Sequence, residues 1–247
     1  MKYAINRENY HRFDVIEVSK LPPRSYFIPF DTKEASDGVS LKEKRYASSK
    51  VRCLSGDWDF RFYPQPALLP QELDTDNMTF DTIDVPSCWQ FRGYDRPFYV
   101  NIRYQFPYDP PRIPMEEPVG RVFSWIGVDT KVRPRWITPK EEYNFVGVYR
   151  KKFTVENPSK RQILSFLGVA SCLDLYVNGV FVGYSEGSHN TAEFDITPRL
   201  HNGENELLAV VRRWCTGTYL EDQDSSIQHR TDHSHTHHPV RHKFQIR

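Results

Sequence analysis

Short runs of alternating apolar and polar residues, separated by turn-forming residues, extend along much of this chain. Trp58-Asp59-Phe60-Arg61-Phe62 has the period of two that is expected of a strand with one buried face. The chain lacks the regular apolar spacing of long amphipathic helices. The pattern predicts an all-β fold, with the strands packed as a β-sandwich. The expected strands are at residues 58–62, 82–85, 98–104, 148–155, 163–167, 173–177, 180–182, 193–196 and 207–211.

The clearest local signal is the dipeptide Asn178-Gly179, which stands between two β-rich runs. Asparagine and glycine tolerate positive φ, which a two-residue type I′ hairpin loop requires at both positions. The dipeptide therefore predicts a β-hairpin here.

Three regions differ from this strand pattern. Residues 1–50 are mixed and polar, and prolines at positions 22, 23 and 29 exclude a helix in the stretch 21–30. We expect residues 1–50 to form an extended N-terminal arm on a domain that spans residues 51–224. Residues from about 115 to 142 are an insert in that domain. Residues 225–247 are rich in histidine and poor in apolar side chains, and we expect a disordered tail.

Composition and charge exclude several classes of protein. The 33 basic and 32 acidic residues nearly cancel, which argues against a nucleic-acid partner and against a polybasic membrane surface. We find no apolar run of about 20 residues that would span a membrane. The start of the chain lacks the apolar core of a secretory signal. The four scattered cysteines have no metal-binding spacing, so we expect reduced thiols and a cytoplasmic protein.

Two polar positions are candidates for binding chemistry. Asn101 ends the aromatic run Pro97-Phe98-Tyr99-Val100-Asn101, and its amide can both donate to and accept from a sugar hydroxyl. The acidic loop Glu221-Asp222-Gln223-Asp224 offers hard oxygen ligands to a cation or acceptors to a sugar. The alternatives without a ligand are a strand-end asparagine bonded to backbone and a solvated acidic loop.

Five motifs occur in order along the chain: Leu54-Ser55-Gly56-Asp57-Trp58-Asp59-Phe60, then Val85-Pro86-Ser87-Cys88-Trp89-Gln90 with Gly93-Tyr94-Asp95 and 97–101, then Val177-Asn178-Gly179 with Val182-Gly183-Tyr184-Ser185, then Glu193-Phe194-Asp195-Ile196 with Gly203-Glu204-Asn205, and then Trp214-Cys215-Thr216-Gly217-Thr218-Tyr219-Leu220 with 221–224. Together they resemble the N-terminal sugar-binding domain of glycoside hydrolase family two. The second and fifth motifs are similar to those of the family's large β-galactosidases.

This resemblance implies a jelly-roll β-sandwich and two site residues. Asn101 matches an asparagine that contacts galactose. Asp224 matches an aspartate that contacts galactose and ligates sodium. The full-length family enzyme also binds magnesium, but Thr216 stands where some members have an aspartate of a structural magnesium site. We therefore expect that magnesium site to be absent here.

The resemblance also implies that catalysis takes place elsewhere in the family enzyme. The full-length enzyme hydrolyses terminal β-D-galactosides such as lactose with two glutamates on a (β/α)₈ barrel. A barrel needs about 250 residues. We expect this chain to be truncated before the barrel and inactive alone, with the missing catalytic part or a second copy as its partner. The alternative is a non-catalytic carbohydrate-binding or interaction module, such as a subunit of a split galactosidase.

Overall fold

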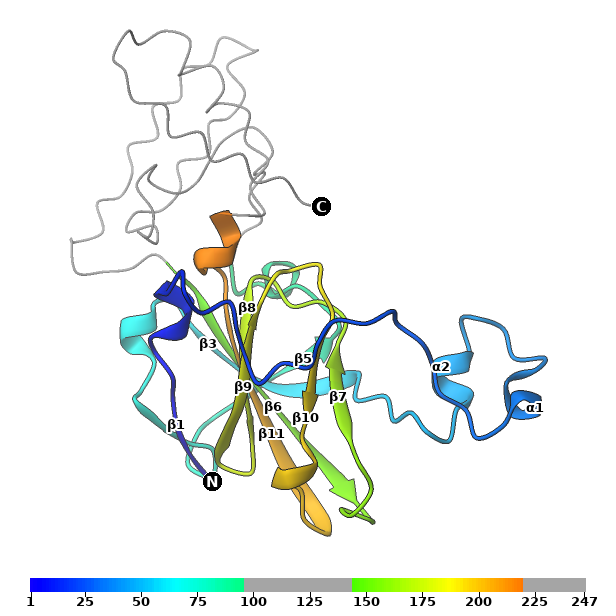
Figure 1. The fold of residues 1–247 in the computed structure, drawn as a ribbon. Helices are drawn as coiled ribbons and strands as arrows, with labels where there is room; N and C mark the ends of the chain where they lie inside the picture. The colour runs from blue at the N-terminus through cyan, green and yellow to red at the C-terminus, as the bar shows by residue number, and fades with distance from the viewer. Residues whose placement is uncertain (96–143, 220–247) are drawn as a thin grey trace, which may run out of the picture.

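A computed structural model describes residues 1–95 and 144–219 of the chain. Its main element is a seven-stranded sheet in the order β2-β9-β8-β11-β6-β3-β5, in which every neighbouring pair is antiparallel. Two further antiparallel pairs, β1 with β4 and β7 with β10, complete the strands (Figure 1). The strands are β1 (Lys2–Ala4), β2 (Glu17–Val18), β3 (Gly56–Tyr63), β4 (Glu72–Asp74), β5 (Asp81–Val85), β6 (Val146–Val155), β7 (Ile163–Phe166), β8 (Cys172–Val177), β9 (Val180–Glu186), β10 (Ala192–Asp195) and β11 (Gly203–Arg212).

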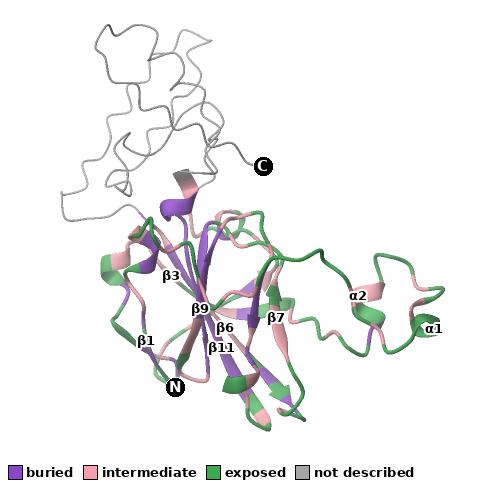
Figure 2. Cartoon of the chain, viewed as in Figure 1, coloured by how far each residue is buried: buried purple, intermediate pink, exposed green. Residues whose placement is uncertain are grey.

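The large sheet is covered on both faces, which is why its central strands are almost wholly buried (Figure 2). On one face, alternate residues of β8 and β11 such as Leu175 and Ala209 pack against Phe194 of β10. On the other face, Tyr176 and Leu208 pack with Tyr3 of β1. The same strand therefore contributes to two apolar layers.

The prediction of an all-β sandwich is confirmed. Eight of the nine expected strands are found close to their expected bounds, and residues 98–104 lie outside the described residues. The expected hairpin is also present, with φ of 50° at Asn178 and 83° at Gly179. The insert at about 115–142 and the tail at 225–247 also lie outside the described residues.

The helices of the described residues are short. Two of them are α-helices, α1 (Lys33–Ser36) and α2 (Lys44–Ala47), and they lie in a loop that extends away from the sandwich (Figure 1). Within residues 1–95 and 144–219, no helix is long and apolar enough to cross a membrane. The 3₁₀ turns are η1 (Asn9–His11), η2 (Pro66–Leu68), η3 (Trp89–Arg92), η5 (Thr197–Arg199) and η6 (Thr216–Tyr219).

Candidate functional site

The predicted site residues Asn101 and Asp224 both lie outside the described residues, but the segments that lead to them are described. Asp95 lies shortly before Asn101, and Arg213 lies directly after β11, on the way to Asp224. The guanidinium of Arg213 forms an ion pair with the carboxylate of Asp95, and both side chains are at least nine-tenths buried. The two sequence motifs that carry the predicted site residues therefore meet at one end of the sheet.

A second contact attaches Asn144, the first described residue after position 143, to the same end of the sheet. Asn144, which is fully buried, accepts a hydrogen bond from the backbone N–H of Trp214 and donates one to its carbonyl oxygen, each at 2.9 Å. One amide side chain thus satisfies both backbone groups of Trp214, as a neighbouring strand would. Residues 95 and 144 are both attached to residues 213–214.

A cluster of aromatic rings supports this end of the sheet. The ring of Tyr94 lies 4.7 Å from that of Phe60, and Phe62 lies 5.4 Å from Phe145, measured between ring centroids. Trp89 in η3 packs on the same group. The guanidinium of Arg213 lies 4.7 Å from the centre of the Trp214 ring, within the range of a cation–π contact. These contacts fix the position of the Asp95–Arg213 pair.

The turn η6, which follows β11 and precedes the acidic loop, is attached to the end of β9. Glu186 there accepts hydrogen bonds on Oε1 from the Tyr184 hydroxyl at 2.6 Å and from the Thr216 hydroxyl at 2.7 Å. Burial raises the pKa of Glu186 above its ordinary value, against the effect of these two hydrogen bonds. The thiols of Cys172 and Cys215 lie in the same buried cluster.

The N-terminal segment holds the last residue of β11 from the other side. Arg212 forms a buried ion pair with Asp174 of β8, and it donates from Nη2 to the carbonyl oxygen of Asn6 at 2.6 Å. Its guanidinium also lies 4.4 Å from the centre of the Tyr10 ring. The exit of β11 is therefore held from both faces of the sheet.

Comparison with known families agrees with this arrangement. The family model described as "Glycosyl hydrolases family 2, sugar binding domain" matches residues 51–138 and 136–231. The chain belongs to this family. The match includes every residue of the Asp95–Arg213 and Asn144–Trp214 contacts, and it also includes Asn101 and Asp224.

Several similar curated proteins are β-galactosidases. That of Actinobacillus pleuropneumoniae is 36% identical over 211 residues, which cover 85% of this chain and 18% of the relative. That of Alteromonas mediterranea is 37% identical over 186 residues, which cover 72% of this chain and 15% of the relative. This family 2 chain thus spans less than a fifth of the length of either relative.

The similarity to the following solved structure is lower. A β-glucuronidase of Bifidobacterium dentium aligns with a TM-score of 0.36 and 22% identity, over 64% of this chain and 19% of that protein. The assignment of an all-β sandwich therefore rests on the strands and sheets described above.

The sequence does not identify the residues that anchor the candidate site. Asp95 is part of the second motif, but its partner Arg213 is 118 positions away in the chain. Asn144 lies outside all five motifs, and no local signal distinguished it. Such pairings depend on which strands become neighbours, and one sequence does not show that.

The described residues around Thr216 do not by themselves form a magnesium site. Its hydroxyl donates to Glu186 and lies 3.3 Å from the carbonyl oxygen of Arg12. Glu186 is the one carboxyl in this set, and the neighbouring sulfurs of Cys172 and Cys215 are soft ligands. Magnesium instead prefers several hard oxygen ligands in octahedral geometry. Across the described parts of the chain, no group of three or more His, Cys, Asp or Glu side chains is placed to hold a metal ion.

Proposed function

We propose that this chain supplies the sugar-binding domain of a β-galactosidase, with Asn101 contacting galactose and Asp224 contacting both galactose and a sodium ion. The observation that supports this most is the attachment of residues 95 and 144 to residues 213–214. That attachment brings the described residues nearest to Asn101 and Asp224 in the two motifs to the same end of the sandwich. The β-galactosidase relatives support galactose as the sugar.

In this proposal, the whole enzyme hydrolyses terminal β-D-galactosides such as lactose, and the remaining four-fifths of its length supply the catalytic carboxyls. Its location would be the cytoplasm. The four cysteines are free thiols, which suits a reducing compartment. The partner of this domain is then the catalytic part of the enzyme.

The 247-residue polypeptide by itself is expected to show no hydrolysis of a chromogenic β-galactoside. Retaining glycosidases need an acid/base and a nucleophile about 5 Å apart, and in this proposal both lie on the catalytic part. Release of the chromophore should equal that of buffer, in a preparation from a host that lacks its own galactosidase. Turnover well above buffer that persists in the Asp224→Ala variant would show that this chain has a catalytic centre of its own.

Galactose is expected to bind the isolated chain no better than the millimolar range, which corresponds to about −4 kcal/mol. One or two sugar hydrogen bonds contribute roughly 0.5–1.5 kcal/mol each, against about 4 kcal/mol or more for lost translational and rotational freedom. An NMR titration measures this, with Asn101→Ala and Asp224→Ala as matched controls. Micromolar affinity that both substitutions abolish would favour a stand-alone carbohydrate-binding module over a part of an enzyme site.

A further inference from the structure

One buried carboxyl lies beneath η6 and is paired with no cation among the described residues. Glu186 is 8% exposed, and both hydrogen bonds to its Oε1 come from neutral hydroxyls. Its Oε2 has no hydrogen-bond partner of good geometry and lies against the backbone of Gly217, where a Cβ would come within 2.5 Å of it. A larger residue at position 217 would therefore require the Glu186 side chain to shift.

The groups around Glu186 come from four elements. Tyr184 lies on β9 and Cys172 begins β8, while Cys215 and Thr216 follow β11. The N-terminal segment adds Tyr10 and the Arg12 carbonyl oxygen. The nearby arginine side chains have acidic partners of their own, since Arg12 pairs with Asp14 and Arg212 pairs with Asp174.

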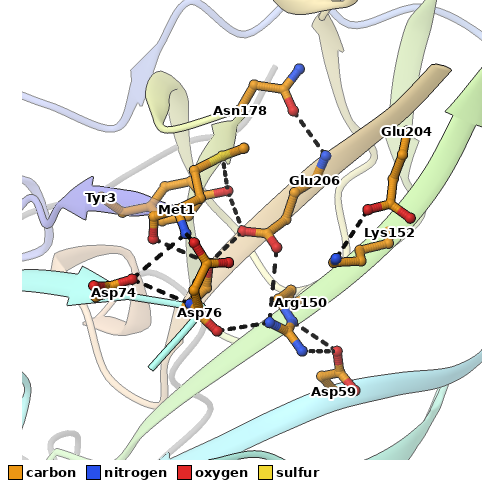
Figure 3. A network of polar contacts seen from close by, with 11 residues as sticks. Met1, Tyr3, Asp59, Asp74, Asp76, Arg150, Lys152, Asn178, Glu204 and Glu206 are labelled. Atoms are coloured by element: carbon orange, nitrogen blue, oxygen red, sulfur yellow. Dashed lines mark hydrogen bonds and ion pairs between the residues drawn. The ribbon is translucent and has the colours of Figure 1, made fainter. Parts of the chain in front are cut away.

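A second buried glutamate of the same sheet provides a contrast (Figure 3). Glu206 of β11 is 4% exposed, and its Oε1 likewise accepts from two hydroxyls, those of Tyr3 at 2.8 Å and Thr75 at 2.7 Å. Its Oε2, however, lies 3.9 Å from Nη1 of Arg150. Each glutamate thus accepts from one tyrosine and one threonine hydroxyl, but among the described residues only Glu206 has a cation beside it.

We propose that Glu186 is a positioning residue, which holds the turn Thr216–Tyr219 onto the end of the sheet by hydrogen bonds alone, without a bound cation. The turn in this way sets the direction in which the chain leaves toward Asp224, a consequence that rests on the proposed function. The Thr216 hydroxyl of η6 and the Tyr184 hydroxyl of β9 donate to the same oxygen of Glu186, which links the turn to the strand.

The proposal leads to a definite pH dependence. Because folding raises the pKa of Glu186, protonation of this group favours the folded state. The resulting stabilisation is complete below the ordinary pKa of 4.5 and is lost as pH rises through the pKa of the folded state. Glutamine keeps an oxygen for both hydroxyls and never carries the charge.

Thermal unfolding of the 247-residue chain from pH 4.5 to pH 8 tests this, with Glu186→Gln, Glu186→Ala and Glu206→Gln compared with the parent. Relative to Glu186→Gln, the melting temperature of the parent should fall as pH rises. At pH 8 the melting temperature of Glu186→Gln should equal that of the parent or exceed it by about 2–4 °C. Glu186→Ala should melt about 4–8 °C below the parent, because two buried hydroxyls lose their acceptor. Glu206→Gln should melt below the parent at pH 8, because it leaves Arg150 without this neighbouring carboxylate.

Hydrogen exchange of the backbone amides in residues 213–219, followed by mass spectrometry, separates positioning of the turn from general stability. Exchange there should be faster in Glu186→Ala and equal to the parent in Glu186→Gln. The proposal is wrong if Glu186→Gln is as damaged as Glu186→Ala, or if magnesium chloride raises the melting temperature of the parent but not that of Glu186→Gln. These measurements use no sugar, so they hold whether or not the chain binds galactose.

Discussion

Replacement of Asp174 by alanine is expected to lower the free energy of unfolding by about 3–5 kcal/mol. The side chains of Asp174 and Arg212 are 0% and 1% exposed, so the substitution leaves a buried guanidinium without its counter-charge. The Asn6 carbonyl oxygen and the Tyr10 ring, which also contact Arg212, do not neutralise that charge. Because a whole domain is stable by only about 5–15 kcal/mol, urea denaturation should show a large loss.

The pair between Asp84 and Arg92 provides a matched control. Both side chains are nearly half exposed, at 47% and 46%, so Asp84→Ala should change stability by no more than about 1 kcal/mol. The double variant Asp174→Leu with Arg212→Met, which removes both charges, should be more stable than Asp174→Ala alone. A loss below 1 kcal/mol in Asp174→Ala would mean that water reaches Arg212 and that the N-terminal segment does not cover it.

Gly147→Ala is expected to lower the free energy of unfolding by about 1–3 kcal/mol, because it adds a methyl group to a filled core. A Cβ at position 147 would lie 2.7 Å from a ring carbon of Trp89 and 2.8 Å from one of Phe60. Both rings are buried in the aromatic cluster that supports the Asp95–Arg213 pair, so neither can move freely. Denaturant unfolding of the two proteins measures the change.

The smaller side chain in Phe60→Leu provides a test of that cause. If crowding causes the loss of stability, Gly147→Ala should lower the free energy of unfolding less in the Phe60→Leu variant than in the parent. Equal costs in both backgrounds would point instead to the backbone of β6, and the steric explanation would be wrong.

Much of the sandwich could be predicted from the sequence, because its longer strands carry their own pattern. The alternation in 58–62 and the Asn178-Gly179 dipeptide depend on local geometry, and both were confirmed. The strands β1, β2 and β4 were missed. Each has only two or three residues, which is too short for a period to be seen, and each exists because a partner strand is already in place.

The buried charges could not be predicted for a related reason. In Leu173-Asp174-Leu175, alternation puts the aspartate on the face opposite the leucines, where solvent is the default expectation. The structure covers that face with the N-terminal segment, so Asp174 is buried and needs Arg212. The candidate site was likewise only partly predictable, since the motifs identified Asn101 and Asp224 but not the Asp95–Arg213 and Asn144–Trp214 contacts behind them.

The double attachment at residues 213–214 has a consequence for how this domain can vary in length. Asp95 and Asn144 are both held there by contacts with residues 213–214, so the two ends of the intervening segment are anchored at one place. The entropic cost of closing a loop grows only slowly with the number of residues in it. We therefore expect an insertion between these two anchors to leave β5 and β6 in register with β3.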